Sequence, residues 1–182
     1  MGNFYFSIET TGLNPEEDKI LAIQFQELDR TTGGPIGELQ IFKEWESSEK
    51  EILKQFFKKS KILEDYPFNF VPVGYNLGFE RKFIKQRAFL HQLPGMDLLD
   101  KPFIDLRALG ILMNQGEFKG SGLDNLTGKE KIEGRQIPVW YNNGEFNKII
   151  GYIKEKAKQF IEFNSWLYKK MPELIEQFKK EK

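Results

Sequence analysis

The sequence predicts an α/β domain in which a mixed central sheet, containing an antiparallel meander, is flanked by helices. The first 42 residues contain three apolar, strand-like segments separated by turns rich in Gly, Pro and Thr. After them, segments with an apolar face at helical spacing alternate with short apolar runs. Hairpin-connected strands pair antiparallel and strands joined through a helix pair parallel, so we expect both kinds of pairing in one sheet.

Length and composition fit one compact domain, residues 1–182. Apolar residues make up 40% of the chain, 17 residues are Phe, and there is no Cys, which excludes disulfides and thiolate metal sites. Lys and Arg together number 27, as do Asp and Glu, so the formal charge is zero and any nucleic-acid binding needs a local basic patch or a metal. No stretch has the pattern of a signal peptide or membrane span, so we expect a cytoplasmic protein without membrane contact.

The first predicted strand is residues 4–9. Phe4, Phe6 and Ile8 alternate with more polar residues, so one face is apolar and the other presents Ser7 and Glu9. A turn over residues 10–15 ends this strand. Residues 20–28 and 36–42 are the second and third strands, joined by a Thr-Thr-Gly-Gly-Pro turn, which completes the meander.

The next elements alternate helix and strand. Ser47 or Ser48 can cap a helix whose apolar face contains residues 52, 53, 56 and 57. Residues 69–75 form a buried strand, although Pro72 is unusual inside one. Residues 78–90 form a helix and residues 103–106 a short strand, followed by a helix to Met113.

The last third is predicted to be mainly helical. A short helix begins at Ser121, and residues 137–144, including Trp140 and Tyr141, form a loop. A long helix runs from Glu145 to Tyr168, Pro172 interrupts it, and a charged helix follows.

The strongest chemical signal is the stretch Ser7-Ile8-Glu9-Thr10-Thr11-Gly12-Leu13. Residues two apart on a strand point the same way, so two carboxylates at this spacing can share metal ions. A pair of Mg²⁺ or Mn²⁺ ions roughly 3.5–4 Å apart activates water and stabilises a leaving oxygen. Only Glu9 supplies a carboxylate here, because the other position is Ser7.

Three stretches together resemble the motifs of the DEDD (DnaQ-like) 3′–5′ exonucleases, which have the RNase H-like fold. The first is similar to Asp-x-Glu-Thr-Thr-Gly-Leu. Residues 76–80, Asn-Leu-Gly-Phe-Glu, resemble the second motif, with Glu80 in place of Asp. Residues 152–156, Tyr-Ile-Lys-Glu-Lys, resemble the third in its Tyr-x-x-x-Asp form, with Lys156 at the aspartate position. Residues 104–106 and 121–126 are also similar to proofreading domains of family-B DNA polymerases.

The resemblance implies a site and a substrate. The catalytic candidates are Glu9, Glu80 and Tyr152, with Tyr152 orienting water. The metal ligands are Glu9, Glu80 and Asp105, holding Mg²⁺ or Mn²⁺. The residues expected to contact nucleic acid are Thr11, Leu13, Asn76, Phe79 and Lys156. The implied substrate is single-stranded nucleic acid, DNA in preference to RNA, and a replication or repair protein is an expected partner.

The charge of the site limits the number of metal ions that it can hold. The family's four carboxylates bring −4 to the metals, whereas Glu9, Glu80 and Lys156 sum to −1. Hard cations depend on anionic oxygen ligands, so a second ion is disfavoured, and one ion or none remains. Asp105 or Asp124 can complete a rearranged site, but Asp105 is also a common kind of strand-end hydrogen-bonding residue.

Several residues have two readings that the sequence leaves open. Ser7 is either a neutral ligand or a small residue filling a former ligand position. Lys156 either contacts a phosphate or forms a salt bridge with Glu9 or Glu80. Leu13 is either a wedge against terminal bases or part of the core. Trp140 and Tyr141 either stack on bases or pack inside the protein.

Three functions therefore compete. The first is a metal-dependent exonuclease that hydrolyses single-stranded DNA from the 3′ end. The second is a catalytically inactive module that keeps the cleft and binds single-stranded nucleic acid or a protein partner. The third is a structural protein that keeps only the fold.

Overall fold

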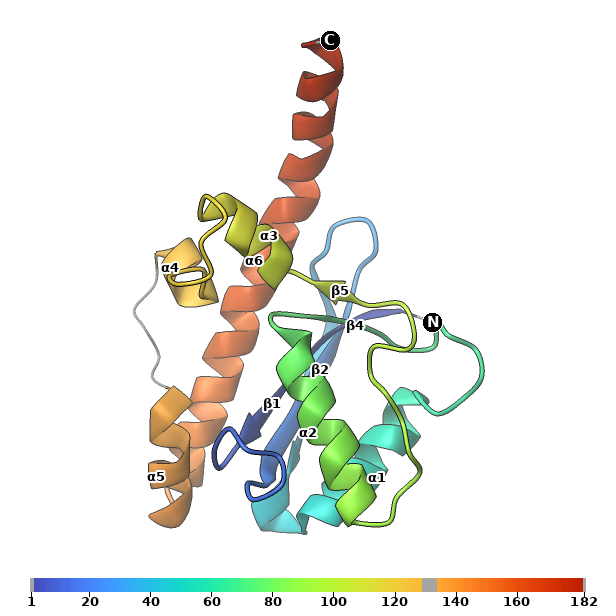
Figure 1. Ribbon diagram of the computed structural model, residues 1–182, viewed down its shortest axis with the longest axis vertical. Helices are drawn as coiled ribbons and strands as arrows, with labels where there is room; N and C mark the ends of the chain where they lie inside the picture. The colour runs from blue at the N-terminus through green and yellow to red at the C-terminus, as the bar shows by residue number, and fades with distance from the viewer. Residues whose placement is uncertain (1, 129–133, 182) are drawn as a thin grey trace.

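A five-stranded mixed sheet forms the centre of the molecule, as a computed structural model shows for residues 2–128 and 134–181 (Figure 1). Its strands lie in the order β3-β2-β1-β4-β5. The first three pair antiparallel, and β4 pairs parallel with both β1 and β5. The predicted meander and mixed sheet are therefore confirmed. The strands are β1 (Asn3–Thr10), β2 (Ile20–Leu28), β3 (Pro35–Lys43), β4 (Val71–Gly74) and β5 (Ile104–Asp105).

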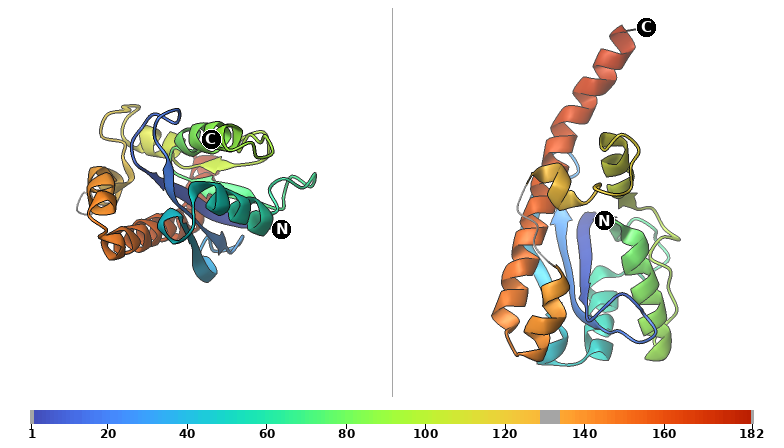
Figure 2. Two further views of the ribbon diagram at one scale, coloured as in Figure 1. Left: turned by 90° about the horizontal axis from the view of Figure 1, so that it is seen from below. Right: turned by 60° about the vertical axis from the view of Figure 1, so that its left-hand side comes forward.

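Helices cover both faces of this sheet (Figure 2). Helices α1 and α2 pack on one face, and the long α6 crosses the other (Figure 1). The helices are α1 (Glu49–Ser60), α2 (Leu77–Leu90), α3 (Arg107–Met113), α4 (Leu123–Thr127), α5 (Ile137–Asn142) and α6 (Phe146–Lys180), with 3₁₀ turns η1 (Glu44–Glu46) and η2 (Gly134–Gln136). None of the described helices is both long and apolar enough to cross a membrane.

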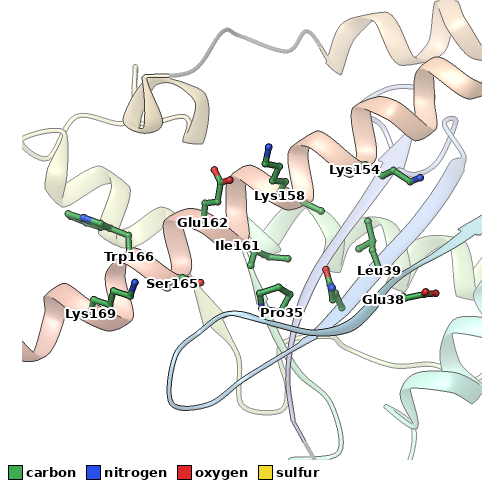
Figure 3. Close-up of a pocket in the computed structure, with 12 residues that line it drawn as sticks. Pro35, Glu38, Leu39, Lys154, Lys158, Ile161, Glu162, Ser165, Trp166 and Lys169 are labelled. Carbon is green, nitrogen blue, oxygen red and sulfur yellow. The ribbon is translucent and has the colours of Figure 1, made fainter.

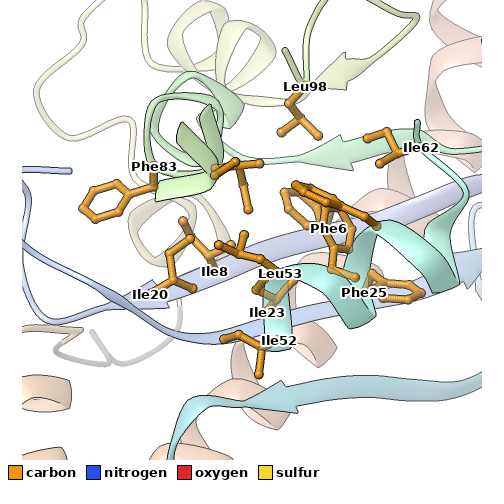
Figure 4. Close-up of a cluster of buried hydrophobic side chains, with 14 of the residues drawn as sticks. Phe6, Ile8, Ile20, Ile23, Phe25, Ile52, Leu53, Ile62, Phe83 and Leu98 are labelled. Carbon is orange, nitrogen blue, oxygen red and sulfur yellow. The ribbon is translucent and has the colours of Figure 1, made fainter. Parts of the chain in front are cut away.

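The alternation along β1 divides its side chains between two cores. Phe6 and Ile8 point into the larger core beneath α1 and α2, where Phe6 stacks on Phe56 with ring centroids 5.1 Å apart (Figure 4). Tyr5 points the opposite way and packs on Phe160 of α6. Because side chains alternate along a strand, Ser7 and Glu9 share the α6 side with Tyr5. This is how β1 brings its polar pair to the third motif.

Most predicted boundaries hold within a few residues. Ser48, not Ser47, caps α1, because its hydroxyl accepts from the backbone N–H of Glu51. Strand β4 is shorter than residues 69–75, and Pro72 lies within it opposite Phe4 of β1. The short helix predicted to begin at Ser121 begins at Leu123 instead.

The prediction of a loop at Trp140 and Tyr141 is wrong, because residues 137–142 form α5. Pro138 lies in the first turn of this helix, where its missing N–H breaks no hydrogen bond. Both aromatic rings are half-buried. Trp140 meets the Tyr152 ring edge-on at 6.4 Å, so the packing reading holds for this side chain.

The predicted break at Pro172 is also wrong, because α6 continues through it to Lys180. A proline removes one backbone hydrogen bond from a helix. The side chains after Leu167 are half-buried or exposed, so water can reach the carbonyl that loses its donor. The last turns of α6 extend beyond the sheet (Figure 1).

A buried carboxylate joins β2, α1 and α2. Glu49 accepts hydrogen bonds from the backbone N–H of Ile20 and from both Nε and Nη2 of Arg87, at 2.7–2.8 Å. His91 Nε2 lies 2.8 Å from the same carboxylate. Burial alone raises the pKa of Glu49, but the bonds from Arg87 and Ile20 outweigh it and hold the pKa below its usual value.

We expect Glu49→Gln to lower the free energy of unfolding by about 3 kcal/mol, because it leaves Arg87 without its charged partner in a buried position. Urea denaturation at pH 7 measures the change. Glu51→Gln is the control, because Glu51 lies on the same helix with a half-exposed side chain, and it should change stability by less than about 0.5 kcal/mol. Equal effects of the two changes would contradict this role for Glu49.

Candidate functional site

The three motifs meet in one pocket of about 260 Å³ at the end of β1. Strand β1 contributes Glu9, α2 contributes Glu80, and α6 contributes Lys156. The structure therefore brings together residues that lie 147 positions apart in the chain. The remaining lining residues are Ile8, Thr10, Leu13, Tyr75, Asn76, Phe79, Gly134 and Ile137.

Glu9 is buried and held by two donors. Lys156 Nζ lies 2.8 Å from Glu9 Oε1, and Gln24 Nε2 donates to the same oxygen at 2.8 Å. The Lys156 side chain is 31% exposed overall, and Lys156 lines the pocket beside Glu9. The structure thus contains the salt bridge to Glu9, which was one of the two readings left open for this lysine.

The ion pair keeps Lys156 protonated and positively charged. Burial opposes its charged form, but the Glu9 carboxylate more than compensates and raises the pKa of Lys156 above its ordinary value. The Tyr152 ring centroid lies 5.9 Å from the ammonium. Burial raises the pKa of Tyr152, so its hydroxyl stays protonated at neutral pH.

Glu80 lies in a different environment, although it lines the same pocket. It is 5% exposed, and Ser7 Oγ donates to its Oε1 over 3.3 Å. Burial raises the pKa of Glu80 to about 8, while Lys156 acts in the opposite direction. At pH 7 Glu80 is therefore mostly protonated and the Glu9–Lys156 pair is neutral overall.

Asp105 binds backbone amides. Its carboxylate accepts from the N–H groups of Asn76 and Leu77 at the start of α2, at 2.8 and 2.9 Å, and from Arg107 N–H at 3.0 Å. These contacts fix the first turn of the helix that carries Glu80. Asn76 itself has a left-handed backbone, φ 72°, which is unusual for a residue other than Gly and shapes the same turn.

Of the other residues predicted to contact nucleic acid, Leu13 and Phe79 line the pocket and Thr11 does not. Leu13 is 83% exposed at the rim of the pocket, so its reading as a core residue is wrong. Phe79 lines the pocket and packs on Phe83, with ring centroids 4.8 Å apart. Thr11 shapes the loop, because its hydroxyl donates to Asp18 and accepts from Lys19 N–H, both at 3.0 Å.

Sequence reasoning missed Gln24. It is fully buried and lies opposite Ser7 in the register of β1 and β2, with its amide on Glu9. One signal was available, since Gln24 is a polar residue inside the apolar run Ile20–Phe25, and a buried amide requires a polar partner. Which partner it meets depends on the register between the strands.

The family model of the RNase H superfamily matches residues 4–165, which is most of the chain. The chain belongs to the RNase H superfamily. Solved structures of exonuclease I share its fold. The ExoI/SSB-Ct complex aligns with a TM-score of 0.59 and 15% identity over 96% of this chain. E. coli exonuclease I in complex with a dT13 oligonucleotide aligns with a TM-score of 0.55 and 16% identity, also over 96%.

At this identity the likeness shows the fold alone, and the alignments cover only 42% of each exonuclease I chain. This RNase H superfamily member thus spans less than half the length of those proteins. No curated protein matches the sequence. The expected RNase H-like fold is confirmed, whereas the roles of individual residues have to be argued from their own contacts.

The pocket of this RNase H superfamily member does not fit a pair of divalent ions. Among residues 2–128 and 134–181, no three Asp, Glu, His or Cys side chains are grouped so as to hold a metal ion. Ser7 brings no charge, and the Lys156 ammonium contacts the Glu9 oxygen that a metal would use. Asp105 does not join Glu9 and Glu80 in the pocket. The donor set is therefore too small and too weakly anionic for two ions.

Proposed function

We propose that this chain is a non-catalytic module of exonuclease fold that binds single-stranded nucleic acid in the pocket around Glu9. One observation carries the proposal: Lys156 Nζ lies 2.8 Å from Glu9, where the three motifs meet. This ion pair stabilises the buried carboxylate without a metal. Glu9 and Glu80 still line the pocket, but Ser7 and Lys156 supply no anionic ligand.

The surface of the pocket supports binding of a strand. The Lys156 side chain is partly exposed, and we expect its ammonium to contact a phosphate that enters the pocket; Leu13 presents an exposed apolar side chain at the rim. Phe79 lines the same pocket. A cation beside apolar and aromatic groups suits single strands, whose bases expose their faces. Exonuclease I, which shares this fold, has been solved with a dT13 oligonucleotide, and we extend that ligand class to this chain.

A protein partner of the replication or repair machinery belongs to the same proposal. Its support is the solved ExoI/SSB-Ct complex, which involves a protein of this fold. We place the module in the cytoplasm and treat residues 1–182 as one domain. DNA is the proposed strand.

Binding is tested by fluorescence anisotropy of a labelled dT13 strand in EDTA, which removes any contribution from divalent metals. We expect Leu13→Ala to weaken binding about three- to tenfold without affecting the fold, because Leu13 is 83% exposed. Lys156→Gln should reduce the slope of log affinity against log salt concentration by about one, which corresponds to one phosphate contact. Lys158→Gln is the matched control, since it removes the same charge from the same helix but lies outside the pocket. Absence of binding in EDTA would refute the proposal.

A second candidate function is a nuclease that uses a single ion, as Mg²⁺ or Mn²⁺ at Glu9 and Glu80. The observation that favours it is Glu80 Oε2, a buried carboxylate oxygen without a hydrogen-bond partner among the described residues. The test is degradation of a 5′-labelled single strand in Mn²⁺. Activity that disappears in the variant Glu9→Ala, Glu80→Ala would establish the nuclease and displace the first proposal.

A further inference from the structure

A groove of about 910 Å³ lies between α6 and β3. It shares no lining residue with the pocket around Glu9. Figure 3 shows its two sides, with side chains of α6 on one and Pro35, Glu38 and Leu39 of β3 on the other. It is larger than the candidate nucleic-acid pocket and has no part in the proposed function.

Strand β3 is an edge of the described sheet. Its residues 35–38 are exposed and residues 39–43 are half-buried, so no helix covers it fully. An edge strand presents a row of backbone N–H and C=O groups that no neighbouring strand uses. Such an edge can accept an extended segment as an additional strand.

The floor of the groove is apolar. Leu39 of β3 and Ile161 of α6 both line it, and Trp166 at one end is 46% exposed. Exposed apolar area of this kind, enclosed between a strand and a helix, favours a ligand with apolar side chains. A nucleic acid would leave this floor without complementary contacts.

The α6 side of the groove is basic. Lys154, Lys158 and Lys169 line it, and none of them forms an ion pair with any carboxylate in residues 2–128 and 134–181. Two carboxylates, Glu38 and Glu162, also line the groove. Lysines thus outnumber carboxylates, and their charge is complementary to acidic side chains of a ligand.

We propose that the groove is a docking site for an extended segment of a partner protein, rich in apolar and acidic residues, which adds a strand to β3. The dimensions agree with this occupant. From Lys154 to Lys169 the helix rises about 22 Å, which is the length of about seven residues of a strand. Lys154 and Lys158 are about 6 Å apart along the helix axis, close to the spacing of alternate strand residues.

The test is selection of random ten-residue peptides, displayed on phage, against the full chain. We expect enrichment of peptides that combine apolar and acidic residues, and amide shift changes at residues 35–43 when a selected peptide is added to isotope-labelled protein. The variant Lys154→Glu, Lys158→Glu, Lys169→Glu should weaken binding of that peptide at least tenfold. The control Lys50→Glu, Lys58→Glu, Lys59→Glu makes the same charge change on the exposed face of α1 and should leave binding unchanged.

Backbone methylation separates strand addition from simple charge attraction. A peptide N-methylated at one set of alternate residues should lose binding, and a peptide methylated at the other set should keep it, because a strand uses alternate N–H groups toward one neighbour. Four results would overturn the proposal: no enrichment, selected peptides that bind both triple variants equally, tolerance of both methylation patterns, or occupation of the groove by dT13 or a second copy of this chain.

Discussion

Replacing Ser7 and Lys156 together by aspartate is expected to create a Mn²⁺ site that the parent lacks. The change makes the four motif positions more negative by three charges, one at Ser7 and two at Lys156. It also removes the ammonium that lies 2.8 Å from Glu9. At these distances each unit of charge changes the interaction with a divalent ion by several kcal/mol, so affinity should rise at least about a hundredfold. Isothermal titration with Mn²⁺ measures it.

The matched control for this experiment is Ser7→Asn, Lys156→Asn, which has nearly the same side-chain shapes without the added charge. It should bind Mn²⁺ no better than the parent. If the aspartate variant also degrades a 5′-labelled strand in Mn²⁺ and the parent does not, the two substitutions are sufficient to make the pocket catalytic. If the parent binds Mn²⁺ as tightly as the aspartate variant, Lys156 does not prevent metal binding, and the proposed non-catalytic function loses its main support.

Glu80 should make the free energy of unfolding depend on pH between about 4.5 and 8. Its pKa rises from 4.5 to about 8 on folding, chiefly because it is buried. Between these values the native state holds a proton that the unfolded state has released. The stabilisation is therefore complete below pH 4.5, falls with rising pH, and is lost above pH 8. The decrease should reach a few kcal/mol, at most about 5.

Glu80→Gln isolates this effect, because the amide has the shape of the protonated acid and does not titrate. Urea denaturation of parent and variant at intervals from pH 5 to 9 gives the difference in free energy of unfolding, in which most other titrating groups cancel. The parent should lose stability relative to Glu80→Gln as the pH rises. A difference that is constant over this range would mean that Glu80 ionises in the native protein near its ordinary pKa.

Local patterns predicted most of the elements. Apolar alternation marked β1, β2 and β3, and Ser48 with the following apolar stripe marked α1, because these signals depend on neighbours in the chain. The two clear errors involve prolines. Pro138 lies in the first turn of α5, and Pro172 lies inside α6. Whether a proline ends a helix depends on where the lost hydrogen bond falls, and the sequence around it does not fix that position.

The sequence alone predicted four of the residues that gather at the candidate site, but not Gln24. Ser7, Glu9, Glu80 and Lys156 follow from the three motifs, and their summed charge already argued against two metals. Only the tertiary structure decided how they are paired. Lys156 binds Glu9, Glu80 lies buried beside Ser7, and Asp105 caps α2. The physical reason is that a motif consists of residues close together in the chain and can be recognised there. The pairing of charges depends instead on strand register, burial and helix orientation, which arise only when distant segments pack together.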